Sequence, residues 1–376
     1  MNTTKNKTHI VHDLFAFILI VFLAYVTQDF LIPIFFAILL SVLVYPIVKY
    51  FETRLCFNRI VSILIAILVF TSIIFLIFVL IGIQFQDIMD KSDMYYDKIL
   101  EKTNILIKET ENSTGIESKD IVGGDSIEVK EIVKRNSNKI VDFVTRSGAI
   151  LSDFVLTPLY MFFFLLYRSF LISFLYKATS KVSDRKNMRL ILDQLYDVQQ
   201  NYLVGLVSVM FIVGVLNSIG LLALGIDYPF FFGFLCALLL LVPYIGIIIG
   251  SLLPALIALA TKDSYWYSFG VIAIFGFIQF IEGNFITPKI TGSKVSLNSF
   301  VSILVIILFS MLWGIPGMIL ALPITASLKV IFDHSVKFKA IGFVLGQAEE
   351  KYFSNKAKYR LKIWKRIRKQ KRKENK

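Results

Sequence analysis

The sequence predicts an all-α protein that crosses a membrane several times and carries a small helical insert outside the bilayer. Hydrophobic residues make up 56% of the 376 residues and charged residues 18%, whereas a soluble domain carries about 25% charged residues. The mean hydropathy is +0.71. About eight apolar segments follow one another, and two of these are overlong, with prolines and glycines near their middles.

Short polar stretches separate most of these segments, and one long polar insert interrupts them. The segments comprise residues 14–28, 30–48, 60–85, 148–167, 202–225, 230–261, 264–281 and 298–328. Only Asp29 divides the first two, so we expect this pair to form a tight helical hairpin. Residues 1–13 are polar, and no small-residue cleavage site ends the first apolar run. A cleaved signal peptide is therefore not expected.

Basic residues in short loops indicate which side of the membrane each loop occupies. Residues 49–59 contain three Lys or Arg and residues 168–201 contain six. Both loops, and both termini, are therefore expected on the cytoplasmic side. The polar insert at residues 86–147 then lies outside. Its apolar positions recur at helical spacing around a glycine-containing break, which predicts a helical hairpin that is either a lid or a solvated spacer.

This pattern divides the chain into successive regions. They are N-terminal membrane segments in 1–85, the external insert in 86–147, a membrane segment with a basic loop in 148–201, a C-terminal membrane region in 202–335 and a basic tail in 336–376. Each overlong segment can cross the membrane once, or can enter and leave on one side as a broken hairpin. At 1.5 Å per residue, the 32 residues of 230–261 would form a helix of roughly 48 Å. The hydrocarbon core is about 30 Å thick, which favours the re-entrant version.

The first overlong segment contains Pro243, Gly246, Gly250 and Pro254. Pro243 cannot donate a backbone hydrogen bond, and the two glycines form a face on which another helix can approach closely. The freed carbonyl groups and the Tyr244 hydroxyl are therefore candidates for lining a transport pathway. The alternative is a kinked span that packs through its glycines.

The second overlong segment contains Gly314, Pro316, Gly317 and Pro323. Together they disfavour a continuous helix. Two interrupted segments that flank one ordinary span are typical of transporters in which half-helices form a substrate site near the bilayer midplane.

Between the two breaks lies the densest polar cluster of the hydrophobic half, which begins at Gln279. Glu282 follows three residues later and so shares its helix face, with Asn284 and Pro288 just beyond. An ionisable group at membrane depth is costly and commonly lines a cavity or an ion route. Glu282 could therefore exchange a proton with a coupling cation. The alternative is an interfacial helix cap with Glu282 among the lipid headgroups.

Asp153 is a further candidate for the pathway, because it lies five residues before Pro158 in an apolar run. Its alternative role is to cap the outer end of that span. The three histidines lie outside the predicted spans and offer no metal-ligand set. Phosphate-binding, zinc-protease and serine-nucleophile motifs are absent from the sequence. We therefore expect neither an enzyme nor a cofactor, and uphill transport would use an ion gradient.

The net charge of +13 arises mainly near the C-terminus, because sixteen of the forty Lys and Arg lie at or after Lys329. In residues 356–376, basic residues alternate with apolar ones such as Trp364. Such a segment is typical of one that lies on anionic lipid, at about 1 kcal/mol per basic residue. Nucleic-acid binding is the less favoured alternative.

Three motifs together resemble the autoinducer-2 exporter family of bacterial transporters. They are Val-Pro-Tyr-Ile-Gly-Ile-Ile-Ile-Gly-Ser-Leu-Leu-Pro at 242–254, Gln-Phe-Ile-Glu-Gly-Asn-Phe-Ile-Thr-Pro-Lys at 279–289 and Gly-Ile-Pro-Gly-Met-Ile-Leu-Ala-Leu-Pro at 314–323. Their order and separations match that family, and the similarity extends over nearly the whole chain. Ile247 departs from the pattern, since members of the family often have proline there.

The resemblance implies a multi-pass, homo-oligomeric protein of the bacterial cytoplasmic membrane, in a family of which some members export small polar signals such as autoinducer-2. The first hypothesis is thus a transporter of a small polar molecule that does not use ATP, with Tyr244, Gln279, Glu282 and Asn284 near its pathway. The second is a sodium or lithium/proton antiporter that uses the same carboxylate, as proposed for some members. The third is a non-transporting membrane scaffold, for which proline-glycine breaks are unnecessary.

Overall fold

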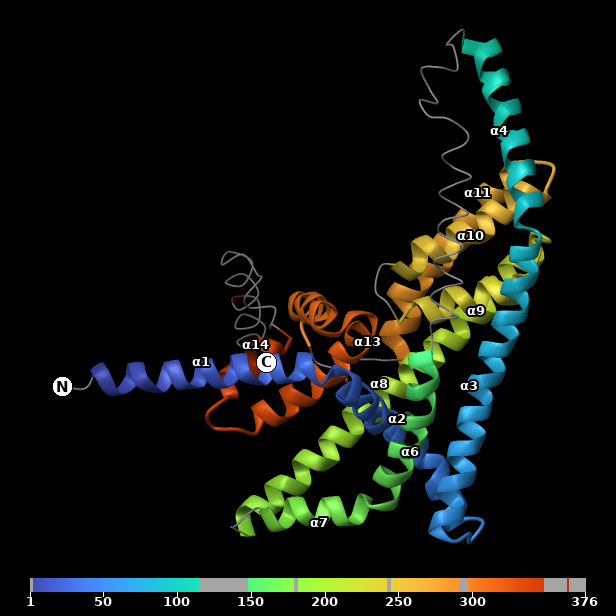
Figure 1. The fold of residues 1–376 in the computed structure, drawn as a ribbon. Helices are drawn as coiled ribbons and strands as arrows, with labels where there is room; N and C mark the ends of the chain where they lie inside the picture. Colours follow the sequence, from blue (N-terminus) through green and yellow to red (C-terminus); the bar gives the residue numbers. More distant parts are fainter. Residues whose placement is uncertain are drawn as a thin grey trace, which may run out of the picture.

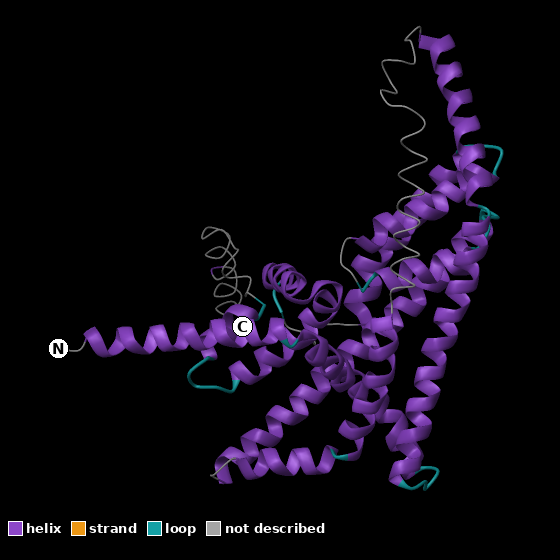
Figure 2. Cartoon of the chain, viewed as in Figure 1, coloured by secondary structure: helices purple, strands orange, loops and turns teal. Residues whose placement is uncertain are grey.

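The computed structural model describes residues 3–114, 148–178, 182–241, 245–290, 297–347 and Trp364. Every regular element in these ranges is a helix (Figure 2). In chain order they are α1 (Thr3–Val26), α2 (Gln28–Thr53), α3 (Arg59–Asp90), α4 (Ser92–Thr114), α6 (Gly148–Leu166), α7 (Arg168–Ala178), α8 (Val182–Ala223), α9 (Pro229–Leu239), α10 (Ile245–Thr261), α11 (Trp266–Ile281), the π-helix η2 (Glu282–Ile286), α12 (Thr287–Ile290), α13 (Ser299–Asp333) and α14 (Lys339–Leu345).

Within the described ranges, five helical stretches are long and apolar enough to cross a membrane. They are α2, α3, Arg185–Ala223 of α8, Trp266–Ile290 from α11 to α12, and α13. The pair of α6 and α7, bent by 62° at Tyr167, is a sixth candidate. These helices confirm the predicted all-α polytopic architecture.

The N-terminal half is held together by α2, α3 and α6, which pack side by side (Figure 1). Their shared core consists of Ala37, Val44, Val48, Ile63, Ala66, Ile67, Met161 and Leu165. At one end of this bundle, Arg168 donates a hydrogen bond to Glu52 at 2.6 Å and lies 5.0 Å from the ring centroid of Tyr45. This contact fixes the start of α7 against α2.

The tight hairpin expected of the first two apolar segments is not formed. A single residue, Thr27, joins α1 to α2, and α1 runs away from the bundle (Figure 1). Backbone hydrogen bonds of the helical type continue through the junction, from Thr27 to the Leu23 carbonyl and from Leu31 to the Thr27 carbonyl, both at 2.9 Å. Because the junction keeps this helical bonding, it bends the chain and does not reverse it.

The first overlong segment is broken, and α10 returns along α9. A Cβ atom on Gly246 would lie 2.5 Å from the Leu239 carbonyl oxygen, and one on Gly250 would lie 2.6 Å from Cys236 Sγ. Phe231 near the start of α9 and Ala258 near the end of α10 belong to one buried cluster. The segment thus doubles back between α9 and α10, as the sequence analysis favours. Pro243 and Tyr244 lie outside the described residues.

The second overlong segment, α13, also doubles back. Gly314 has φ 62° and ψ −140°, which interrupts the helix. Beyond this kink Gly317 packs against the Phe309 carbonyl, and Val305 shares a buried cluster with Ala321. The two halves of α13 are therefore antiparallel neighbours. The re-entrant reading of the sequence predicts this geometry for both segments.

The predicted external insert begins with α4, which continues almost directly from α3 and lies against α10 (Figure 1). Lys102 of α4 donates hydrogen bonds to the backbone carbonyls of Leu259, at 2.9 Å, and of Lys262. Residues 115–147, the second half of the expected helical hairpin, lie outside the described residues. So does the basic tail after residue 347, apart from Trp364, and with it the expected lipid contact.

Candidate functional site

Both broken hairpins border one partly open cavity of about 320 Å³. Its walls come from α8, from the end of α9, from η2 and α12, and from both halves of α13. The lining residues are Tyr202, Leu206, Val209, Leu240, Leu241, Glu282, Thr287, Leu297, Ser302, Met318, Ile319 and Leu322. The lining is mainly apolar, and among the described lining residues only Glu282 carries a carboxylate. This composition is typical of a small-molecule site, in which few polar groups fix the orientation of the ligand.

The chain places Glu282 at the first residue of a π-helical turn. The Thr287 backbone N–H donates to the Glu282 carbonyl, five residues earlier, instead of the usual four. Pro288 follows and has no N–H to offer, so the carbonyl groups of Gly283 and Asn284 lose their usual donor. Single π-helical turns inside α-helices occur frequently at functional sites. Here the turn separates α11 from α12 next to the cavity.

Each oxygen of the Glu282 carboxylate accepts a hydrogen bond. Gln279 Nε2 donates to Oε2 at 2.6 Å, and Thr287 Oγ1 donates to Oε1. An ionised carboxylate has about four acceptor positions, so two remain for a ligand or for water. The site therefore combines a fixed carboxylate with unused acceptor capacity. Gln279 holds the carboxylate without lining the cavity itself.

The structure brings only some of the predicted site residues together. Glu282 lines the cavity and Gln279 holds it, whereas Asn284 is exposed and donates its side-chain hydrogen bond back to the Phe280 carbonyl at 2.9 Å. Asp153 lies in α6, which contributes no residue to the cavity, and its side chain lies outside the described part. Tyr244 also lies outside it. These assignments therefore stay predictions.

The helix-breaking residues shape the hairpins and do not line the cavity. Gly246, Gly250, Pro254, Gly317 and Pro323 are buried. Gly314 and Pro316 sit at the tip of the α13 hairpin, and Pro288 follows the π-helical turn.

Sequence reasoning missed several polar residues around this cavity. Tyr202 and Ser302 line it, although neither belongs to a recognisable motif. Gln199, which is 6% exposed, donates to the Pro323 carbonyl at 2.7 Å and to Ser327 Oγ at 2.6 Å. It fell within the stretch expected to be a basic cytoplasmic loop, where the structure has α7 and the start of α8. The sequence signal that could have identified Gln199 is an amide side chain just before a long apolar helical stretch.

Two doubled-back hairpins around a mainly apolar cavity with one hydrogen-bonded carboxylate, in a polytopic helical protein, are typical of membrane transporters. Residues 14–337 match the model of the AI-2E family transporters. Because this match covers most of the chain, the protein belongs to the AI-2E transporter family. The predicted resemblance is confirmed.

Individual relatives are similar over shorter stretches. A Bacillus subtilis protein, YrrI, whose name assigns it transport only provisionally, is 34% identical over 155 residues, or 41% of this chain and 43% of that protein. The Escherichia coli AI-2 transport protein TqsA is 26% identical over 149 residues, or 40% of this chain and 43% of TqsA. The chain thus spans less than half the length of these relatives in either match.

Proposed function

We propose that the protein moves a small polar solute across the membrane through the cavity at Glu282, without hydrolysing ATP. The observation that carries this proposal is the convergence of both broken hairpins and a hydrogen-bonded carboxylate on one cavity. Backbone that doubles back at membrane depth is tolerated where it is buried in protein or lines a cavity. Half-helices around such a cavity can rearrange to open it to either side.

The chemistry of the lining favours an uncharged molecule rich in hydroxyl groups. Glu282 can accept hydrogen bonds, and the hydroxyls of Thr287, Ser302 and Tyr202 can accept or donate them. The apolar remainder of the wall contributes contact area. Because TqsA is named for AI-2 transport, we take autoinducer-2 as the first candidate. We place the protein in the bacterial cytoplasmic membrane with α4 outside, on the distribution of its basic loops.

The test is transport in proteoliposomes that hold the purified protein and carry an imposed proton or sodium gradient. Autoinducer-2, sodium and lithium are assayed separately. Gradient-dependent movement of autoinducer-2 supports the solute transporter, whereas exchange of sodium or lithium for protons without it supports the antiporter. Tight vesicles that move none of these cargoes would favour the scaffold and contradict the proposal.

Two variants connect this activity to the cavity. Glu282→Gln keeps the shape of the side chain and removes its charge, so we expect gradient-driven transport to fall by about tenfold or more, since hydrogen bonds to charged groups contribute about 1.5–3 kcal/mol. Asn284→Ala is the matched control, because Asn284 lies two residues away and outside the lining. Unchanged, still gradient-dependent transport in Glu282→Gln would exclude the proposed role of the carboxylate.

A further inference from the structure

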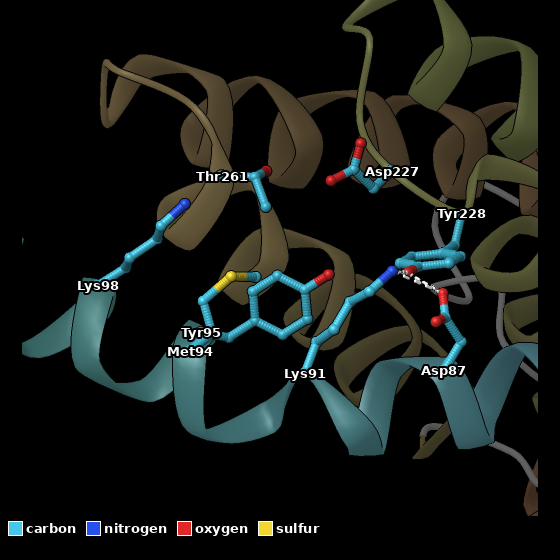
Figure 3. Close-up of a pocket in the computed structure, with 8 residues that line it drawn as sticks. All are labelled: Asp87, Lys91, Met94, Tyr95, Lys98, Asp227, Tyr228 and Thr261. Atoms are coloured by element: carbon cyan, nitrogen blue, oxygen red, sulfur yellow. Dashed lines mark hydrogen bonds and ion pairs between the residues drawn. The ribbon is translucent and has the colours of Figure 1, made fainter.

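A second and larger cavity, of about 620 Å³, lies where α3 passes into α4 (Figure 3). It is lined by Asp87, Lys91, Met94, Tyr95, Lys98, Asp227, Tyr228 and Thr261. It shares no residue with the cavity at Glu282. Its volume falls within the range of about 300–1,000 Å³ that is usual for small-molecule sites. Its lining is mainly polar, in contrast to the first cavity.

The turn between α8 and α9 forms one wall of this cavity through an uncommon backbone conformation. Tyr228 has φ 56°, in the left-handed region. A bulky residue rarely adopts this conformation, and such strain is found mainly at binding and switch sites. Gly225, with φ 65°, supplies the preceding left-handed residue. Together they aim the Tyr228 ring at the end of α3, where it meets Asp87 and Lys91, and leave Asp227 beside the cavity (Figure 3).

On one side of the cavity, the polar side chains already form hydrogen bonds with one another. Lys91 Nζ donates to Tyr228 Oη at 2.8 Å and to Asp87 Oδ2 at 2.9 Å, and Tyr228 donates to the same carboxylate. The hydrogen bond to Tyr228 and the contact with Asp87 raise the pKa of Lys91 well above its ordinary range. Lys91 therefore stays protonated and engaged. This triad fixes the wall and leaves its members little capacity for a ligand.

The other side presents two charges without partners. Lys98 of α4 and Asp227 of the α8–α9 turn are both exposed, and neither forms an ion pair or hydrogen bond with another described residue. Figure 3 shows them on opposite sides, with the hydroxyls of Tyr95 and Thr261 between them. Tyr95 itself is 5% exposed and anchored in the core, so its hydroxyl is a fixed polar group. An unpaired cation and an unpaired anion thus face one concave surface.

We propose that this cavity binds a small zwitterion of the amino-acid class, with its carboxylate on Lys98 and its ammonium group on Asp227. The four charged residues among the described lining, two Asp and two Lys, sum to zero, so this part of the wall attracts neither a free anion nor a free cation strongly. A neutral molecule with separated charges matches both unpaired groups at once, and that arrangement gives specificity. The hydroxyls of Tyr95 and Thr261 lie where the middle of the ligand would pass.

The test is a saturation-transfer NMR titration of the full chain in nanodiscs with 4-aminobutanoate and 6-aminohexanoate. Butanoate and butylammonium, which carry one charge each, serve as comparison probes. We expect at least one zwitterion to bind, and both single ions to bind more weakly by up to about fivefold, the limit of what one solvent-exposed ion pair contributes. Equal binding of zwitterions and single ions, or no saturable binding of either zwitterion, would overturn the proposal.

Variants then locate the site. Lys98→Gln and Asp227→Asn should each weaken zwitterion binding by up to about fivefold, whereas Asp263→Asn, in the neighbouring turn and outside the described lining, should not. The exchange Lys98→Asp with Asp227→Lys restores both charges with reversed polarity, so binding should return. Failure of the exchanged protein to bind, while its helix content and thermal midpoint match the wild type, would also overturn the proposal. The readout is equilibrium binding, so its failure leaves transport through the Glu282 cavity untouched.

Discussion

Gln279 donates its side-chain hydrogen bond to Glu282 one helical turn later, over 2.6 Å, and so holds a carboxylate at the cavity between two doubled-back hairpins. The spacing of three residues puts both side chains on one face of α11. Asn284, two residues after Glu282, lies on the opposite side of the helix and is exposed, whereas the wider π-helical turn brings Thr287, five residues on, to the same face as Glu282. The change of helix type over these five residues thus allows Thr287 to act as the second donor to the carboxylate.

The first prediction concerns the second donor to this carboxylate. Thr287→Val keeps the shape of the side chain and removes the hydroxyl that binds Glu282 Oε1. An acceptor left without its donor costs about 1–3 kcal/mol where water is excluded. We expect a lower thermal midpoint and slower transport. Thr287→Ser keeps the hydroxyl and should behave as the wild type in both assays. Wild-type transport in Thr287→Val would mean that the hydroxyl does not support the site.

The second prediction tests the hairpin tip in α13. Gly314 has φ 62° and ψ −140°, a combination that costs a residue with a Cβ about 1–3 kcal/mol. Gly314→Ala should therefore lower the thermal midpoint, although nothing lies within 4 Å of the new Cβ atom. Gly276→Ala is the control, because that position is helical and equally open. There alanine should stabilise by about 0.5–1 kcal/mol. Equal effects of the two substitutions would contradict the strained conformation at Gly314.

Length and composition favoured the re-entrant version of both overlong segments over the alternative of single spans. The stretches 230–261 and 298–328 are too long for single spans, and their prolines and glycines mark the places where a helix cannot continue. The shared face of Gln279 and Glu282 followed from helical spacing alone. These predictions rest on local rules, which the sequence displays directly.

Features that depend on distant contacts were not predictable. Tyr202 and Ser302 meet in one cavity across a hundred residues of chain, and no local pattern distinguishes them from other polar residues near helix ends. The course of α1 was predicted wrongly, because hydropathy identifies an apolar segment without showing the direction it takes. Sequence rules assign the left-handed conformation to glycine or asparagine, so they do not predict it at Tyr228. The second cavity, of which this turn forms one wall, therefore had no recognisable sequence motif.

The third prediction concerns the attachment of α4 to α10. Lys102 donates to the carbonyls of Leu259 and Lys262 at the end of α10, where a cation also complements the helix dipole, an effect of about 0.3–1 kcal/mol. Lys102→Met should therefore speed amide exchange in α4 by up to about fivefold. Lys98→Met, one turn earlier and without a bond to α10, is the control. Identical exchange in the two variants would show that α4 is held by its apolar contacts instead.

The last prediction is a pH dependence of stability that arises from Tyr95. Burial, with a hydrogen bond to Tyr228, raises the pKa of Tyr95 from 10.0 to about 12. The folded state then holds this proton more tightly than the unfolded state does. The contribution of Tyr95 to the free energy of unfolding is therefore complete below pH 10 and is lost as the pH rises to 12. Between pH 8 and pH 11 the wild type should lose about 1 kcal/mol more stability than Tyr95→Phe.

The measurement is the free energy of unfolding of both proteins at the two pH values. Each protein is compared with itself at the two pH values. The hydrogen bond to Tyr228, which the variant lacks at both pH values, therefore does not enter the comparison. Parallel losses in the two proteins would show that the Tyr95 hydroxyl titrates as in water, and hence that it is not enclosed by α4 and the α8–α9 turn.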